Sequence, residues 1–145
     1  MTARVEHTMS IPAPPEQVWD FLVDPEKRAR PISVIVDFQI DTADARRATW
    51  ELKLPIPLIR NTVTVKTEDI EREPPEYVKF VGRSKIMRIT GEHELQPIEE
   101  GTRVTSRFEV DGRLPGVEKY FKRNFRDEFD NVEQALLEEI EPSIK

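Results

Sequence analysis

The sequence contains no cysteine, which excludes disulfide bonds, a thiolate nucleophile and cysteine-ligated zinc or iron–sulfur sites. No apolar run approaches the roughly 20 residues that are needed to cross a bilayer. Residues 1–6 lack the apolar segment of a signal peptide, so we expect a cytoplasmic protein. Positive charge is not in excess either. The formal net charge is −6, which argues against nucleic-acid binding, since that needs a basic surface.

Glycine is scarce, with five residues against twelve prolines, and this ratio is typical of stiff loops. Hydrophobic residues make up 37% and charged residues 34% of the chain, a balance that suits a folded protein rather than a disordered one. A length of 145 residues is enough for one real core. We therefore expect a single domain over residues 1–145.

The clearest pattern in the chain is an apolar stripe over residues 114–140. Its members recur every three or four residues, as one face of a long amphipathic helix requires: Leu114, Val117, Phe121, Phe125, Phe129, Val132, Leu136 and Ile140. Pro115 suits the first turn of such a helix, and Pro142 should end it. A single helix that follows many strands can bury this stripe only by lying across a sheet.

Upstream of this helix, alternating apolar and polar residues predict seven strands with one buried and one charged face. The inward side chains should be Val5, His7, Met9 and Ile11; Val34, Val36, Phe38 and Ile40; Trp50, Leu52 and Leu54; Val63 and Val65; Val78 and Phe80; Met87, Ile89, Gly91, His93 and Leu95; and Val104, Ser106, Phe108 and Val110. Between the first two strands, Val18, Trp19 and Leu22 mark one short helix. Asp24 and Pro25 are typical of the start of a second.

Several motifs along the chain together resemble a known superfamily. They are residues 11–22 (IPAPPEQVWDFL), 24–26 (DPE), 90–91 (TG), 95–97 (LQP), 101–105 (GTRVT) and 112–116 (GRLPG). With the order of elements, they resemble the START-like (SRPBCC) superfamily, and within it the accessory proteins of carbon monoxide dehydrogenase and the polyketide cyclase/dehydratase-like proteins. The resemblance covers essentially the whole chain. It implies an α+β helix-grip fold, with a curved seven-stranded antiparallel sheet wrapped around a long C-terminal helix and two short helices after strand one.

The resemblance also implies a ligand cavity between the sheet and the long helix. Strand and helix parity then select its apolar lining, although each residue taken singly is better explained as core: Phe38, Trp50, Leu52, Phe80, Met87, Ile89, Phe108, Phe121 and Phe125. The inward polar candidates are His7, His93 and Ser106. A half-buried histidine satisfied by the backbone is the commoner finding.

Chemistry at these polar candidates lacks partners in the sequence. No inward carboxylate accompanies the two histidines, so a metal site would be incomplete, and a Ser-His nucleophile would lack its third member. We expect neither a metal nor a cofactor. Glu118 and Glu128 lie at the edges of the helix stripe and should reach past the rim into water.

The first half of the long helix is basic, an arrangement that the helix dipole disfavours. Its cations are Arg113, Lys119, Lys122, Arg123 and Arg126. They form either an ordinary solvated face or a basic collar that attracts an anionic ligand head or an acidic partner. The sequence does not choose between these two interpretations.

We expect the protein to bind a hydrophobic small molecule, of lipid, quinone or isoprenoid type, as a carrier or accessory protein. One alternative is a cyclase or dehydratase-type enzyme with His7 or His93 as general base. Another is a protein-binding accessory with a filled core. A peripheral membrane contact and a partner enzyme both remain open.

Overall fold

The computed structural model describes residues 2–57 and 59–140 of the chain. The elements come in the predicted order. They are β1 (Thr2–Ile11), α1 (Pro15–Leu22), α2 (Pro25–Ala29), β2 (Ile35–Ile40), β3 (Arg47–Leu52), β4 (Val63–Glu73), β5 (Tyr77–Arg83), β6 (Met87–Ile98), β7 (Gly101–Gly112) and α3 (Val117–Ile140).

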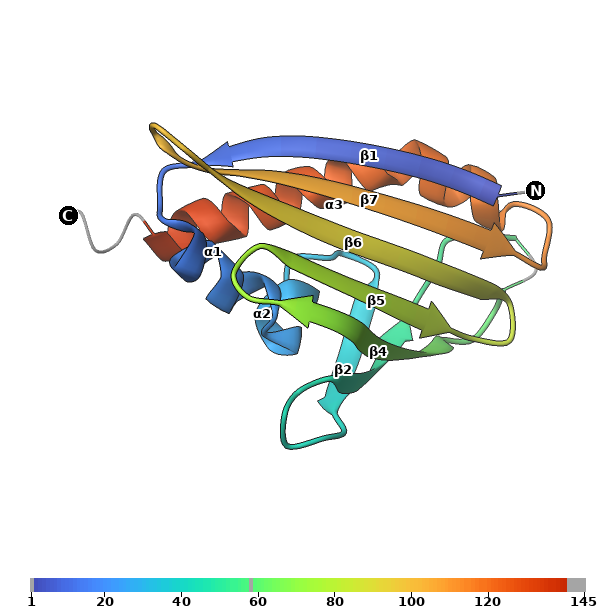
Figure 1. Cartoon of the computed structure of the whole chain (residues 1–145). Helices are drawn as coiled ribbons and strands as arrows, with labels where there is room; N and C mark the ends of the chain where they lie inside the picture. The colour runs from blue at the N-terminus through green and yellow to red at the C-terminus, as the bar shows by residue number, and fades with distance from the viewer. Residues whose placement is uncertain (1, 58, 141–145) are drawn as a thin grey trace.

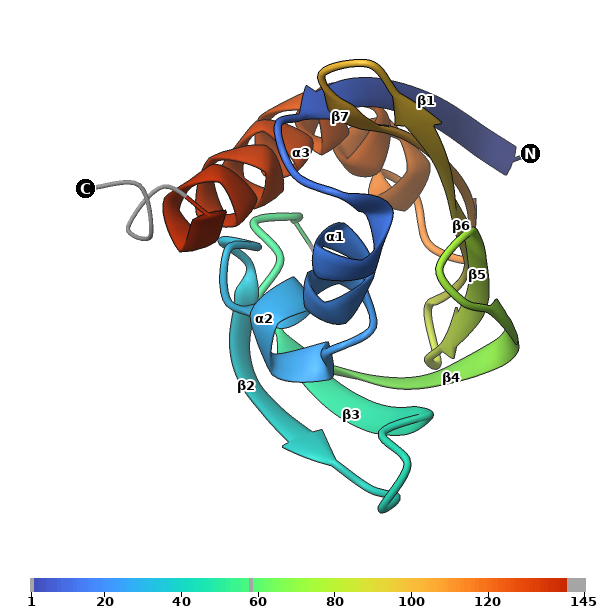
Figure 2. The ribbon, with the colours of Figure 1, turned by 60° about the vertical axis from the view of Figure 1, so that its left-hand side comes forward.

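All seven strands form one antiparallel sheet in the order β1-β7-β6-β5-β4-β3-β2. Strands β2 to β7 follow one another as a meander, and β1 joins the sheet beside β7. The sheet curls so that α3 runs along the inner side of β1 and β7 while β2 lies across from it (Figures 1 and 2). Helices α1 and α2 lie at one end of this curl (Figure 2). The predicted helix-grip fold is confirmed.

The long helix begins three residues later than its apolar periodicity predicts. Gly116 has a φ of +92°, a left-handed conformation that interrupts the helix before Val117. Leu114 therefore precedes α3 and is 37% exposed, so its place in the buried stripe was wrong. Pro142, the predicted end of the helix, lies outside the described residues.

The stripe of α3 is buried against two clusters of apolar residues. Val117 and Phe121, in its first half, share a cluster with Trp50, Val65 and Met87 of the sheet. The second half of α3 belongs to another cluster, which it shares with α1. Members of this cluster include Val18, Trp19, Leu22, Val132, Leu136 and Ile140. Burial of this continuous apolar face against two layers holds α3 across the sheet.

Strand β2 departs from its predicted parity. Val36 is 56% and Ile40 46% exposed, although both were expected to face inward. The pairing with β3 shifts between Ile35 and Asp37, so an irregularity there turns Val36 outward. Ile40 pairs with buried Ala48 but lies at the end of an edge strand, where less of the molecule covers it.

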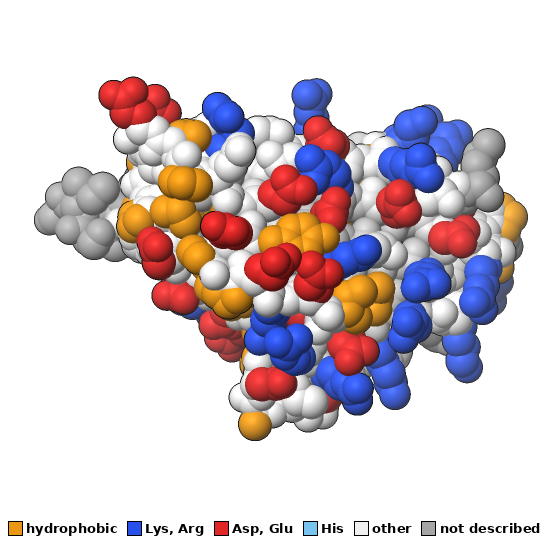
Figure 3. Space-filling view, in the orientation of Figure 1, with side chains coloured by type: hydrophobic (Ala, Val, Ile, Leu, Met, Phe, Trp, Pro, Cys, Tyr) orange, Lys and Arg blue, Asp and Glu red, His pale blue; other side chains and the backbone are white. Residues whose placement is uncertain are grey.

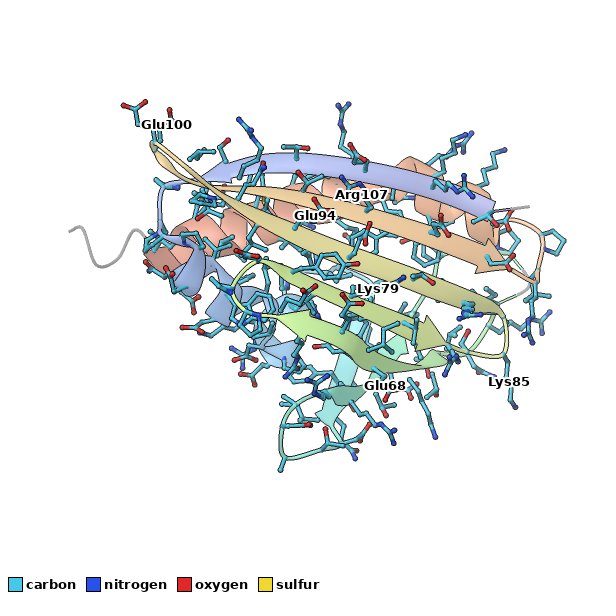
Figure 4. The ribbon with its side chains drawn as sticks, viewed as in Figure 1. Glu68, Lys79, Lys85, Glu94, Glu100 and Arg107 are labelled. Atoms are coloured by element: carbon cyan, nitrogen blue, oxygen red, sulfur yellow. The ribbon has the colours of Figure 1, made fainter. Side chains whose placement is uncertain are left out.

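The outer face of the sheet is charged, as the strand alternation predicts, with acidic and basic side chains interspersed (Figure 3). Arg107 of β7 lies beside Glu94 of β6 on this face (Figure 4). Its guanidinium nitrogens lie 2.7 Å from a Glu94 oxygen and 3.0 Å from a Glu6 oxygen of β1. These ion pairs cross neighbouring strands, so an apolar binding region has to be sought on the inner face.

Candidate ligand-binding cavity

A cavity of about 90 Å³, measured as the space open to the centres of water molecules, lies between the inner face of the sheet and α3. Strands β3, β5, β6 and β7 and the helix all contribute to its wall. The predicted site residues that line it are Trp50, Leu52, Phe80, Ile89, His93, Ser106, Phe108, Phe121 and Phe125. Side chains drawn from four strands and one helix thus converge on one space.

The remaining predicted site residues do not line this cavity. Phe38 is half-buried and packs against the cluster that contains Trp50, closer to the edge of the sheet. Met87 is fully buried in the same cluster. His7 stacks on Phe129 of α3, with ring centroids 4.8 Å apart. All three have the predicted parity, but parity alone does not say how far along its strand the cavity extends.

Aromatic rings form a large part of the apolar wall. Phe108 of β7 lies 5.3 Å from Phe125 and 5.6 Å from Phe80, measured between ring centroids. Gly91 of β6 allows the two strand residues this approach, because a Cβ there would come within 2.5 Å of the Phe80 ring and 2.7 Å of Phe108. The glycine therefore makes room for two of the rings that shape the cavity.

A buried arginine lies in the wall, and the sequence analysis missed it. Helix α2 begins where the Asp24 side chain accepts hydrogen bonds from the backbone N–H groups of Glu26 and Lys27. This places Arg28 inward, where it is 5% exposed and lines the cavity. Its Nη1 donates to the Leu22 carbonyl oxygen at 3.3 Å, and burial lowers the pKa of the guanidinium.

The counter-ion of Arg28 is Asp69 of β4, which is 2% exposed. Arg28 Nη2 lies 3.4 Å from Oδ1 of Asp69, and Arg72 Nη2 lies 2.8 Å from Oδ2. The expectation that no carboxylate faces inward was therefore wrong. Two guanidinium groups share one carboxylate, which leaves this cluster with a net charge of +1 when all three groups are ionised.

His93 is the buried histidine of the cavity. Its Nδ1 lies 2.6 Å from the Ser106 hydroxyl oxygen across the β6–β7 pair. Burial, together with the charge of Arg28, lowers its pKa to about 3. His93 is consequently neutral at physiological pH and a weak base, since an effective general base has a pKa near the working pH.

Glu128 joins α3 to the segment between α2 and β2. The exposed Ser33 donates its backbone N–H to Oε2 of Glu128 at 2.9 Å and its hydroxyl to Oε1 at 2.7 Å. Glu118 instead accepts the Gly112 N–H at 3.0 Å. Both carboxylates thus accept hydrogen bonds from N–H or O–H groups of the protein, whereas the sequence predicted that they would reach into water. The residues beside Ser33 that line the cavity are Ile32, Val34 and Ile35.

Two sequence signals could have located the missed polar groups. Continuing the alternation of β4 beyond Val65 puts Thr67 and Asp69 on the inward side, which the structure confirms. An inward carboxylate needs a buried cation, and that requirement points to an arginine elsewhere. Helix α2, with five residues, is too short for its own periodicity to single out Arg28.

Across the described residues, no three His, Asp or Glu side chains gather as a metal site would require. No helix within residues 2–57 and 59–140 is both long and apolar enough to span a bilayer.

Comparisons with known proteins agree with this geometry. The sequence model of the family described as polyketide cyclase / dehydrase and lipid transport matches residues 2–137. No curated protein matches the sequence. The START-like, polyketide cyclase-like resemblance is therefore confirmed, whereas the likeness to the accessory proteins of carbon monoxide dehydrogenase stays a prediction.

Solved structures with a similar fold come from several bacteria. A protein from Thermus thermophilus has a TM-score of 0.73 at 21% identity, covering 94% of this chain and 97% of that one. A START superfamily protein from Mycobacterium smegmatis gives 0.74 at 14% identity, with 96% and 97% covered. An aromatase/cyclase from a Streptomyces species gives 0.73 at 16% identity, with 100% and 97% covered. At these identities the likeness shows the fold alone.

Proposed function

Because the chain belongs to the polyketide cyclase / dehydrase and lipid transport family, we propose that it binds a hydrophobic small molecule between the sheet and α3. The ligand is of lipid, quinone or isoprenoid type, and the protein carries or presents it. The observation that supports this most is the cavity itself, whose wall is built largely from aromatic and aliphatic side chains. A filled core would have left no such space.

Carriage is favoured over catalysis by the state of the polar groups. His93 has a pKa of about 3, and His7 does not line the cavity. The carboxylate that does line it, Glu128, is bound to Ser33. Acid–base catalysis near neutral pH needs a group that exchanges protons there and reaches the ligand. The wall offers hydrogen bonds and apolar contact, which suit a carrier.

Binding can be tested with the neutral apolar dye N-phenyl-1-naphthylamine, whose fluorescence rises in an apolar site. Ile89 of β6 lines the cavity, so Ile89→Trp should fill part of it and weaken dye binding by about 10-fold or more. Ile98→Trp makes the same change on the same strand, away from the residues that line the cavity. Equal dye affinity in both variants, or no uptake by the parent protein, would reject the proposed site.

The cavity as it stands has room for only several water molecules, since one needs about 10–15 Å³ of such space. A lipid-sized ligand therefore requires the cavity to expand, and we propose that α3 and residues 32–35 separate to allow this. The bonds between Ser33 and Glu128 join these two segments, and we propose that they act as a latch for ligand access.

Opening this latch should change the rates of binding more than the affinity. We expect Glu128→Ala to raise both the association and dissociation rates of the dye by up to about 10-fold, because two charge-assisted but solvent-exposed hydrogen bonds are lost. Ser33→Ala removes one of the two bonds and should give a smaller increase. Stopped-flow fluorescence measures both rates. Asp127→Ala, at an exposed neighbour on the same helix, should leave them unchanged; unchanged rates in Glu128→Ala would contradict the latch.

Transfer of the ligand to a membrane surface or to a partner enzyme would use the basic start of α3. Lys119, Lys122, Arg123 and Arg126 are on this part of the helix, which also supplies Phe121 and Phe125 to the cavity. An anionic surface held by these cations would lie against the same helix as the ligand.

A further inference from the structure

We propose that the ligand is an otherwise apolar molecule with a carboxylate group, and that Arg28 receives this carboxylate inside the cavity. The proposal rests on the ligand binding proposed above and adds to it the chemical class of the ligand. It makes Arg28 the residue that sets specificity. Three observations support it: unpartnered nitrogen atoms in the wall, the position of Arg28 between the rings of Trp50 and Phe80, and the sign of the buried charge.

The wall of the cavity contains buried nitrogen atoms without a hydrogen-bond partner. Among the described residues these include Arg28 Nε, Trp50 Nε1 and His93 Nε2. The three residues are 5%, 7% and 4% exposed, and all three line the cavity. Buried polar groups are nearly always paired in folded proteins, so three unpaired ones around one apolar space indicate a place for ligand oxygen atoms. A ligand oxygen there would meet donors that are already desolvated.

Arg28 links these nitrogen-bearing groups, since it lies over the rings of both Phe80 and Trp50, and His93 lies beside Phe80. The guanidinium carbon of Arg28 lies 4.9 Å from the centroid of the Phe80 ring and 6.0 Å from that of Trp50. The His93 ring lies 6.3 Å from the Phe80 ring. When the Ser106 hydroxyl donates to Nδ1 of His93, the other ring nitrogen carries the proton and is a donor as well. In that tautomer, Arg28, Trp50 and His93 each present an N–H donor to the cavity beside an aromatic wall.

The buried charge determines which oxygen chemistry fits. Arg28 and Arg72 share the single carboxylate of Asp69, so these three side chains carry a net charge of +1, which the carboxylate of Asp24 partly offsets at Arg28. The carboxylate that lines the cavity, Glu128, is held by Ser33 at the surface. A positive charge in a poorly solvated site attracts an anion more strongly than in water. Guanidinium and carboxylate also match in shape, whereas an alcohol or ester oxygen brings no charge.

The test compares two probes with equal chains, decanoate and 1-decanol, as competitors of the neutral dye at mildly alkaline pH. We expect the parent protein to bind decanoate about 10-fold or more tightly than decanol, the range typical of a hydrogen bond to a charged group. Arg28→Met should abolish this preference, because decanoate affinity falls about 10-fold or more while decanol affinity changes by no more than a few-fold. Asp69 keeps its 2.8 Å contact with Arg72 in this variant, which preserves the partner of the carboxylate.

Two further variants keep the outcome interpretable. Arg30→Gln removes a positive charge next to α2 from an exposed site and should retain the full preference for decanoate. Trp50→Phe removes one unpaired N–H and should reduce the preference by a few-fold; this result stands even if Arg28→Met fails to fold. Equal affinity of the parent for both probes, or a preference that survives in both Arg28→Met and Trp50→Phe, overturns the carboxylate proposal while ligand binding stands. If decanoate, decanol and the dye all fail to bind the parent protein, both proposals are overturned.

Discussion

Replacing Phe121 with aspartate should lower the free energy of unfolding by roughly 4 kcal/mol or more. Removing a buried phenylalanine side chain alone costs about 3–5 kcal/mol, and the new carboxylate would be buried without a partner. Phe121 is 7% exposed and contacts Phe125 of the next turn, with ring centroids 5.3 Å apart. Urea unfolding followed by circular dichroism measures the change, and the dye assay should show loss of binding in any variant protein that remains folded.

The adjacent residue provides the control for this substitution. Lys122 is exposed on the same turn of α3, so Lys122→Asp should change stability by no more than about 0.5 kcal/mol. If Phe121→Asp unfolded at the same urea concentration as Lys122→Asp, burial of the apolar stripe against the sheet would be contradicted.

The second large effect is expected at Asp69. Asp69→Asn keeps the shape of the side chain but leaves Arg28 as a buried charge without a counter-ion, and breaking a buried pair in this way costs about 3–5 kcal/mol. The double variant Arg28→Met/Asp69→Asn removes both charges of the pair. It should be more stable than Asp69→Asn alone, because the cost comes from the unpaired charge rather than from the lost contact.

A neighbouring carboxylate on β4 tests whether burial causes the large loss of stability expected for Asp69→Asn. Glu68 pairs with Arg47 at 3.2 Å on an exposed part of the same strand, so Glu68→Gln should cost less than about 1 kcal/mol. Similar costs for Glu68→Gln and Asp69→Asn, or a double variant less stable than the single one, would show that the buried pair does not act as described.

Much of this fold could be predicted because strands and helices encode their buried faces locally. On β6, the side chains of Met87, His93 and Leu95 are all buried, as the alternation predicts. The prediction of inward side chains failed at positions whose burial depends on how the strands pair in the sheet. Val36 lies at a register shift and Ile40 at the end of an edge strand, and neither feature appears in the alternation of the residues.

Strand parity predicted most of the apolar wall of the candidate site together with His93 and Ser106, but not the polar pairs between distant segments. Residues such as Phe80 and Phe108 follow from parity, but the ion pair of Arg28 and Asp69 joins residues 41 positions apart on a short helix and a distant strand. No local period connects them. The bonds between Ser33 and Glu128 are likewise set by tertiary structure, across 95 positions. Long-range polar pairs of this kind emerge only once the backbone has brought the two segments together.

Because β1 pairs with β7, the sheet cannot be completed during synthesis until β7 has been made. Glu6 and Arg107, which pair across these strands, are 101 positions apart, whereas β2 to β7 pair with their sequence neighbours. Strand β1 thus waits without a partner while the meander forms, and long-range pairing of this kind slows folding. Helix α3 emerges later still. We therefore expect the nascent chain to expose the apolar inner face of its sheet until α3 covers it.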